Sequence, residues 1–141
     1  MDFDPLKLEN QLCFPLYAAS KALIRRYEPL LEPLGLTYTQ YIVMLVMWEQ
    51  GTLTVNELGQ RVKLDSGTLS PLLQKLTAKG YIRKQKAEDG RYRVLSLTEE
   101  GAALKERARH VPEQIGSCLR LTPEEARALY TLCYKTVEEV Q

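Results

Sequence analysis

The fold is decided by residues 64–80, which read LDSGTLSPLLQKLTAKG. Asp65 is a favourable helix N-cap. Four leucines then recur at helical spacing, namely Leu69, Leu72, Leu73 and Leu76. Pro71 fits a helix only within the first turn, where backbone N–H groups have no helical partner, and Gly80 ends the pattern. The stretch predicts a short helix with one leucine face and one polar face.

Two further helices are expected before this stretch. Residues 37–40 fit a capping box, in which the Thr hydroxyl and the Gln side chain satisfy each other's backbone N–H groups. The apolar run 41–48 behind it is typical of a buried helix. Residues 54–57 form a second capping box, which opens a short helix ending near Val62. The order is helix, tight turn, leucine-faced helix.

The pattern changes after Gly80. Residues 81–86 and 92–97 read as two strands joined around Asp89-Gly90, which predicts a β-hairpin with a charged tip. A long helix is expected from Thr98, bent near Pro112. A third capping box at residues 122–125 opens the last helix, with proline at its first position.

The first helix is expected to begin at Phe14, because Pro15 disfavours helical geometry at the residue before it, and to run to about Tyr27. Cys13 then lies just before or at the start of that helix. The partial positive charge at a helix N-terminus favours a thiolate there.

Charge is concentrated in the middle of the chain. Residues 60–93 hold nine basic and three acidic side chains, a net charge of +6, whereas the remainder has a net charge of −5. This distribution favours an element that binds a polyanion. The alternative is an ordinary solvated charged face.

Composition excludes several classes of protein. The chain has 141 residues, 45% of them hydrophobic and 26% charged, as in one soluble globular domain. No apolar run approaches the ~20 residues that span a bilayer, and no signal peptide is apparent, so we expect no membrane association and a cytoplasmic protein. Three cysteines and a single histidine, His110, argue against a disulfide framework, a metal site and most enzyme chemistry. We expect neither a cofactor nor a catalytic function.

Helix, turn, helix and basic hairpin together predict a winged helix-turn-helix, in which one helix enters the major groove of double-stranded DNA. Candidate DNA contacts are the polar residues opposite the leucine face and at the hairpin tip. They are Ser66, Thr68, Ser70, Gln74, Lys75, Lys79, Asp89 and Arg91. The alternative is a helical domain whose hairpin has no role in binding.

Three motifs resemble the DNA-binding lobe of MarR-type repressors: residues 53–58 (LTVNEL), 64–73 (LDSGTLSPLL) and 88–91 (EDGR). Residues 8–14 (LENQLCF) and 35–41 (GLTYTQY) resemble one branch more closely, the organic hydroperoxide resistance regulators. The resemblance implies a mainly α fold with a small β-hairpin wing, over a single domain at residues 1–141.

The resemblance also implies how the chain is divided and assembled. The winged-helix lobe would span about residues 35–98, and helices at about 6–34 and 99–141 would form a homodimer. Each lobe would then bind one half-site of an inverted-repeat operator. The long apolar stripes at both ends agree, because they exceed what a small winged core can cover.

In that branch a reactive cysteine is hydrogen-bonded by two tyrosine hydroxyls, which stabilise the thiolate relative to the thiol. The matching positions are Cys13, Tyr27 and Tyr38. Taken alone, each of these residues is more often a packing residue. Some members resolve the oxidised sulfur with a cysteine in the C-terminal region and others with a small-molecule thiol. Cys118, in a stretch expected to break two helices, is the candidate resolving cysteine, and Cys133 is expected in the core.

The function that the resemblance implies is a dimeric repressor that releases its operator when an organic hydroperoxide oxidises Cys13. Two alternatives stay open. One is a MarR-type repressor controlled by a small non-redox ligand, and the other is a thiol peroxidase that uses Cys13.

Overall fold

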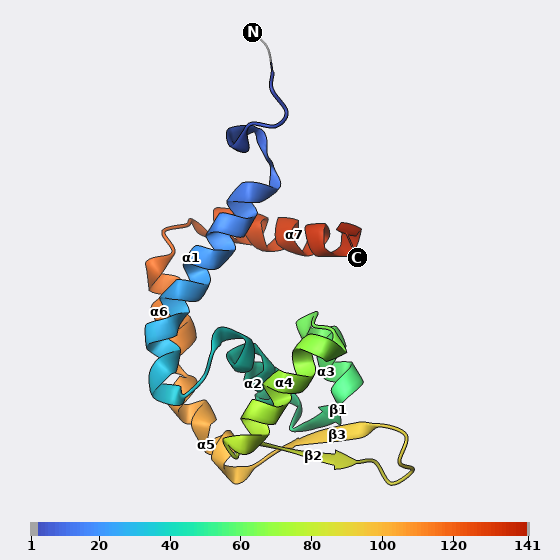
Figure 1. Cartoon of the computed structure of the whole chain (residues 1–141). Coiled ribbons are helices and arrows are strands. Elements are labelled where there is room, and N and C mark those ends of the chain that lie inside the picture. Colours follow the sequence, from blue (N-terminus) through green and yellow to red (C-terminus); the bar gives the residue numbers. More distant parts are fainter. Residues whose placement is uncertain (1–2, 141) are drawn as a thin grey trace. The chain divides into compact units, whose positions relative to one another are not determined.

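The computed structural model describes residues 3–140 (Figure 1). These residues divide into two compact units, one ending at Val111 and one beginning at Pro112. The helices are α1 (Cys13–Leu31), α2 (Tyr38–Gln50), α3 (Val55–Val62), α4 (Ser66–Ala78), α5 (Glu99–Ala108), α6 (His110–Cys118) and α7 (Pro123–Val140). The strands are β1 (Thr52–Thr54), β2 (Ile82–Lys86) and β3 (Arg93–Leu97). Two short 3₁₀ turns are η1 (Leu8–Asn10) and η2 (Glu32–Leu34).

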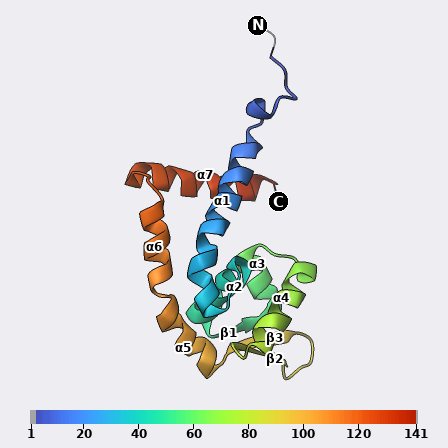
Figure 2. The same cartoon turned by 60° about the vertical axis from the view of Figure 1, so that its left-hand side comes forward.

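The core of the first unit forms where α2, α3 and α4 lie together over a small sheet (Figure 2). Met44 and Met47 of α2 are fully buried, as are Leu58 of α3 and Leu95 of β3. The four leucines of α4 are also buried, which confirms the predicted leucine face. The fold class is confirmed: the chain is mainly helical with a β-hairpin wing.

The sheet has three antiparallel strands in the order β1-β3-β2. The predicted hairpin is confirmed by the β2–β3 pairing, which runs from Ile82 opposite Leu97 to Lys86 opposite Arg93. Strand β1 was not predicted, because three residues are too few to show an alternating pattern. Its central Leu53 pairs with Leu95, so β1 closes the inner edge of the sheet against the core.

The predicted helix starts follow from local hydrogen bonds. Thr37 and Thr54 both form complete capping boxes, and the Asp65 carboxylate accepts a hydrogen bond from the Thr68 N–H at 2.8 Å. Between α3 and α4, Lys63 adopts a left-handed conformation with φ of 59°, and the Leu64 N–H donates to the Gly59 carbonyl. This tight turn sets α4 on the lobe as the second helix of a helix-turn-helix.

The first helix is longer than predicted. It begins at Cys13, and it continues through Pro29 to Leu31 rather than ending near Tyr27. A proline inside a helix removes one backbone hydrogen bond and crowds the carbonyl four residues earlier. Leu31 and Leu34 are almost fully buried just beyond the proline, and this burial offsets the local cost.

Of two other predictions about proline, one was wrong and one was displaced by three residues. Pro71 lies at the sixth residue of α4, in its second turn, where the buried leucines on both sides hold the helix together. The long helix after Thr98 is interrupted at Arg109, between α5 and α6, and not at Pro112. Pro112 is the third residue of α6, a position where a helical N–H has no intrahelical partner anyway.

Large apolar side chains on the terminal helices face solvent. On α1 they include Phe14, Leu16 and Tyr17, and on α7 they include Leu129, Tyr130, Leu132 and Tyr134. Within residues 3–140, no single helix is long and apolar enough to cross a membrane. Only the pair Cys13–Leu34 and Tyr38–Gln50 reaches that length and composition together, and it is bent by 66°.

Candidate nucleic-acid interface and redox site

The exposed face of α4 carries most of the predicted DNA contacts. Ser66, Thr68, Ser70, Gln74 and Lys75 are all exposed, opposite the buried leucines. Asp65 caps the helix, and the hydrogen bond from the Thr68 N–H holds the pKa of its carboxyl below the usual range. The face offers hydroxyls, an amide and a cation, which are groups that pair with base edges and phosphates in a major groove.

The hairpin tip has a defined geometry. Gly90 has a φ of 73°. The Ala87 N–H donates to the Tyr92 carbonyl, and the Gly90 N–H donates to the Ala87 carbonyl. The Asp89 carboxylate accepts a hydrogen bond from the Arg91 N–H at 3.0 Å. Asp89 therefore shapes the turn, and the Arg91 side chain stands exposed at the tip.

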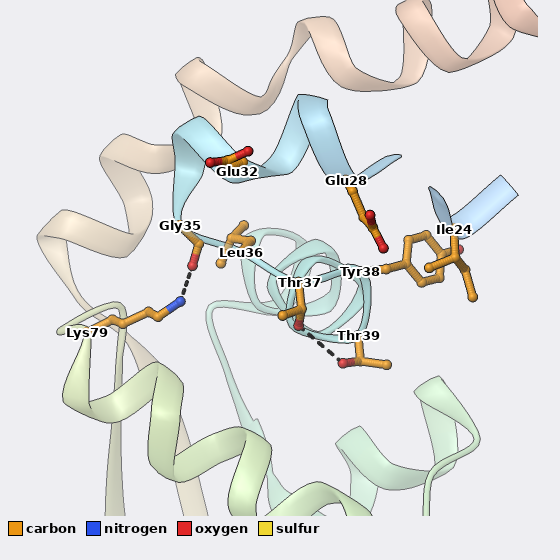
Figure 3. Close-up of a pocket in the computed structure, with 9 residues that line it drawn as sticks. All are labelled: Ile24, Glu28, Glu32, Gly35, Leu36, Thr37, Tyr38, Thr39 and Lys79. Atoms are coloured by element: carbon orange, nitrogen blue, oxygen red, sulfur yellow. Dashed lines mark hydrogen bonds between the residues drawn. The ribbon is translucent and has the colours of Figure 1, made fainter. Parts of the chain in front are cut away.

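Lys79 is engaged within the lobe. It is the C-cap of α4, at the opposite end from Ser66, and its ammonium donates to the Gly35 carbonyl (Figure 3). The same ammonium also donates to Gln40 Oε1 at 3.2 Å. Its contacts link α4 to the segment between α1 and α2. The geometry thus separates Lys79 from the other candidate DNA contacts.

Cys13 is the first residue of α1, and its thiol is free and exposed. The preceding residue, Leu12, has no side-chain hydrogen bond to the helix start. The start of α1 lies at the end of the helix away from the lobe (Figure 1). The thiol is thus accessible to an oxidant from solvent.

Tyr27 and Tyr38 are brought together beneath the other end of α1. Their ring centroids are 4.7 Å apart, and Tyr41 joins them at 5.7 Å from Tyr27. Burial raises the pKa of all three hydroxyls, and for Tyr41 the pKa is raised to about 12, with the other two phenols contributing. The three hydroxyls therefore stay protonated near neutral pH and can donate hydrogen bonds. Tyr41 was not singled out from the sequence, although its spacing of three from Tyr38 places both on one helix face.

The structure does not bring Cys13 to these tyrosines within one chain. Cys13 and Tyr27 are separated by 14 residues of continuous helix, about 21 Å at 1.5 Å per residue. A direct contact between this sulfur and the tyrosine hydroxyls thus requires a second copy of the chain.

An open pocket of about 610 Å³ borders Tyr38 (Figure 3). Its apolar wall includes Ile24 and Leu36, and Glu28 and Glu32 of α1 and η2 add two carboxylates. It is large enough for a small organic molecule.

The other cysteines differ from expectation. Cys118 is exposed and is the last residue of α6, directly before the irregular segment 119–122, rather than inside that segment. Cys133 is only half-buried, and α7 has no buried residue, so the expected core position was wrong for the single chain. The residues described here contain no cluster of three His, Cys, Asp or Glu side chains that could hold a metal ion.

Comparisons with known proteins agree with this geometry. The family of SarA/Rot transcriptional regulators matches residues 25–108. The organic hydroperoxide resistance transcriptional regulator of Bacillus subtilis (strain 168) is 45% identical over 137 residues, covering 96% of this chain and 93% of that protein.

Solved structures of AbfR from Staphylococcus epidermidis are also similar. Reduced AbfR bound to DNA has a TM-score of 0.80 and 31% identity, covering 95% of this chain and 94% of that chain. Disulfide-formed AbfR has a TM-score of 0.67 and 34% identity, covering 92% of each chain. The chain therefore belongs to the MarR-type winged-helix transcriptional regulators, in the branch of the organic hydroperoxide resistance regulators, and is a regulator rather than an enzyme.

Proposed function

We propose that this chain forms a homodimeric repressor, which binds an inverted-repeat operator while Cys13 is reduced and releases it after an organic hydroperoxide oxidises that sulfur. The observation that carries the proposal is the free, exposed thiol at the first residue of α1, in a chain folded as a DNA-binding regulator. The proposed place of action is the cytoplasm, where thiols are kept reduced.

The DNA contacts in this proposal come from α4 and the wing. The exposed side chains of α4 would contact base edges and phosphates in the major groove. These side chains are Ser66, Thr68, Ser70, Gln74 and Lys75. Arg91 would reach the DNA backbone or the adjacent minor groove. Asp89 would act by shaping the tip, and Lys79 is not included among the contacts because its ammonium is engaged at Gly35 and Gln40.

The dimer in this proposal is formed by about residues 6–34 and 99–141, around the lobe at about 35–98. The exposed apolar side chains of α1 and α7 support it, because such surfaces on a monomer mark an interface. A two-fold axis would present two α4 helices to two half-sites, so an inverted repeat matches the symmetry of the protein.

The sensing step is a two-electron oxidation of sulfur. The Cys13 thiolate attacks the terminal oxygen of the hydroperoxide, an S–O bond forms, and the O–O bond breaks. The leaving alkoxide takes up a proton as the alcohol, and the sulfur becomes a sulfenic acid. We propose that Tyr27 and Tyr38 of the second copy donate to the sulfur, since the tyrosines of the same chain are too distant. Tyr27→Phe and Tyr38→Phe should each slow sulfenic acid formation by about tenfold, because a hydrogen bond to a charged group is lost.

The resolving step would use Cys118. Its thiol attacks the sulfenic sulfur of the other subunit, an S–S bond forms, and water leaves. Cys118 is the last residue of α6, beside the irregular segment 119–122. A displacement there breaks fewer intrahelical hydrogen bonds than one within a helix, and such a displacement is needed if the two Cα atoms start more than ~7 Å apart. A covalent dimer on a non-reducing gel should appear after peroxide, disappear in Cys118→Ser and persist in Cys133→Ser. A protein that stays monomeric and gains the mass of a small thiol would instead be resolved without Cys118.

Release of DNA would follow when oxidation strains the dimer and moves the two α4 helices out of register with the half-sites. The test begins with an operator selected by the reduced protein from a pool of random duplexes. Binding is then measured before and after one equivalent of tert-butyl hydroperoxide, with intact mass recorded on both samples. Wild type should release the duplex, and Cys13→Ser should remain bound, because serine lacks the nucleophilic sulfur. Release by Cys13→Ser would remove Cys13 as the sensor.

The pocket beside Tyr38 favours a second candidate function, a repressor controlled by a small non-redox ligand. The same experiment separates the two. A ligand-controlled repressor would keep its operator in the presence of peroxide, and its DNA binding would be identical in wild type and Cys13→Ser.

A further inference from the structure

The segment that joins α1 to α2 is held by two side chains from the DNA-binding lobe and by one from α5. Its carbonyls at Pro33, Leu34 and Gly35 are consecutive, and each accepts a hydrogen bond from a different residue. Arg107 of α5 donates to Pro33 at 2.7 Å, the Tyr81 hydroxyl donates to Leu34 at 3.2 Å, and the Lys79 ammonium donates to Gly35. We refer to Lys79, Tyr81 and Arg107 as the junction clasp.

The three donors occupy positions from which movement would reach the DNA-binding elements. Lys79 ends α4, Tyr81 directly precedes β2 of the wing, and Arg107 lies near the end of α5. Lys79 also donates to Gln40 Oε1 at 3.2 Å, and this same oxygen accepts the Thr37 N–H that caps α2. The clasp therefore ties the junction to α4, the wing, α5 and the start of α2.

The junction itself is stiff. Leu31, Leu34 and Leu36 are buried, and Gly35 takes a left-handed conformation with its N–H bonded to the Glu32 carbonyl at 2.9 Å. A stiff segment transmits a displacement of α1 to neighbouring elements instead of absorbing it. This requires that its polar groups be hydrogen-bonded to the elements that move, here α4 and the wing.

We propose that the junction clasp is the set of positioning residues that carries a movement of α1 to α4 and the wing, so that oxidation at Cys13 changes DNA affinity. This inference rests on the proposed redox function for its physiological role. The hydrogen bonds donated by the three clasp side chains end on neither Cys13 nor a proposed DNA contact. Without the clasp, α1 would move while the lobe keeps its position on the operator.

The test uses the full-length double variant Tyr81→Phe with Arg107→Met, which removes two donors and keeps both apolar stems. Arg109→Met is the matched control, because it breaks the exposed ion pair with Glu106 near the end of α5 without reaching the junction. The first measurement is the ratio of operator dissociation constants for oxidised and reduced protein, with tert-butyl hydroperoxide as oxidant. In the double variant this ratio should fall at least tenfold relative to wild type and to Arg109→Met, while reduced affinity stays within threefold.

A merely structural role would lower Tm, or weaken both affinities in proportion, and would leave the ratio unchanged. An unchanged ratio in the double variant would overturn the proposal.

The second measurement needs no oxidant. Coupling between two sites is reciprocal, so operator binding must stabilise the junction if the junction influences operator affinity. Amide hydrogen exchange of residues 29–36 should therefore slow when operator is added to the wild type. It should not slow in the double variant. Equal slowing in both, or no slowing in wild type, would overturn the clasp. If wild type does not respond to peroxide but the exchange result holds, the redox function fails and the clasp stands.

Discussion

Gly101 lies in the first turn of α5, where the helix crosses the backbone that leads into the wing. A Cβ at this position would lie 2.1 Å from the Tyr81 carbonyl oxygen and 2.8 Å from Leu97 Cδ1. Neighbouring groups hold that carbonyl in place, because it accepts the Thr98 N–H at 3.2 Å and precedes the buried Ile82. Gly101→Ala therefore requires α5 or the start of β2 to shift by about 1 Å before the methyl group fits.

Several contributions set the size of the effect. Overpacking against fixed backbone costs about 3 kcal/mol. A shift of α5 also weakens the hydrogen bond from Trp48 Nε1 to the Gly101 carbonyl, now 2.8 Å, at a cost of about 1 kcal/mol. Alanine regains about 1 kcal/mol through its higher helix propensity. The net destabilisation is about 3 kcal/mol, which lowers Tm by about 10 °C for a chain of this size.

The assay is thermal and urea unfolding at one fixed protein concentration, since a dimer's stability depends on concentration. Gly116→Ala is the matched control, because Gly116 is also helical and no atom beyond the adjoining residues and backbone of its own helix lies within 4 Å of the added Cβ. That variant should gain up to about 1 kcal/mol from helix propensity. Equal Tm values for the two variants would refute the argument that close backbone contact dictates glycine at position 101.

The remaining predictions concern DNA contacts, pH and helix capping. Arg91→Ala should weaken operator binding. Lys75→Ala should reduce by about one the slope of log binding constant against log salt concentration, whereas Lys79→Met should leave that slope unchanged. Equal slopes in the two lysine variants would contradict this assignment. The raised pKa of Tyr41, about 12, means that the unfolded chain loses this proton first, so stability should fall as pH rises from about 10 to 12. Tyr41→Phe should show a shallower alkaline loss in unfolding experiments. For Asp65, whose pKa is lowered in the fold, the stabilisation is present above the unfolded value and is lost as pH falls through the folded one. Asp65→Asn should therefore match wild type in Tm near neutral pH and lack this acid dependence, whereas Asp65→Ala should have a lower Tm.

The features that depend only on residues close together in the sequence could be predicted from it. The capping boxes at Thr37, Thr54 and Thr122 each close over three residues, and all three form. The leucine face of α4 and the hairpin around Gly90 follow from periodicity and turn chemistry in the same way. The position of Cys13 at the start of α1 also follows from local pattern, because Pro15 favours a helix start there.

Other features depended on tertiary packing. Prolines 29 and 71 remain inside helices because leucines buried against other elements outweigh one lost hydrogen bond, and local rules do not include that burial. Strand β1 exists only as a partner of β3. The tyrosine cluster and the junction clasp join residues from separate elements, with 44 to 74 positions between the clasp partners. Sequence thus determined which helices form and what each face carries. The separation of Cys13 from Tyr27 in one chain follows from the continuous helix between them. The tertiary structure decided where Lys79 binds and that Tyr27 lies against Tyr38, because both depend on distances that only the packed chain fixes.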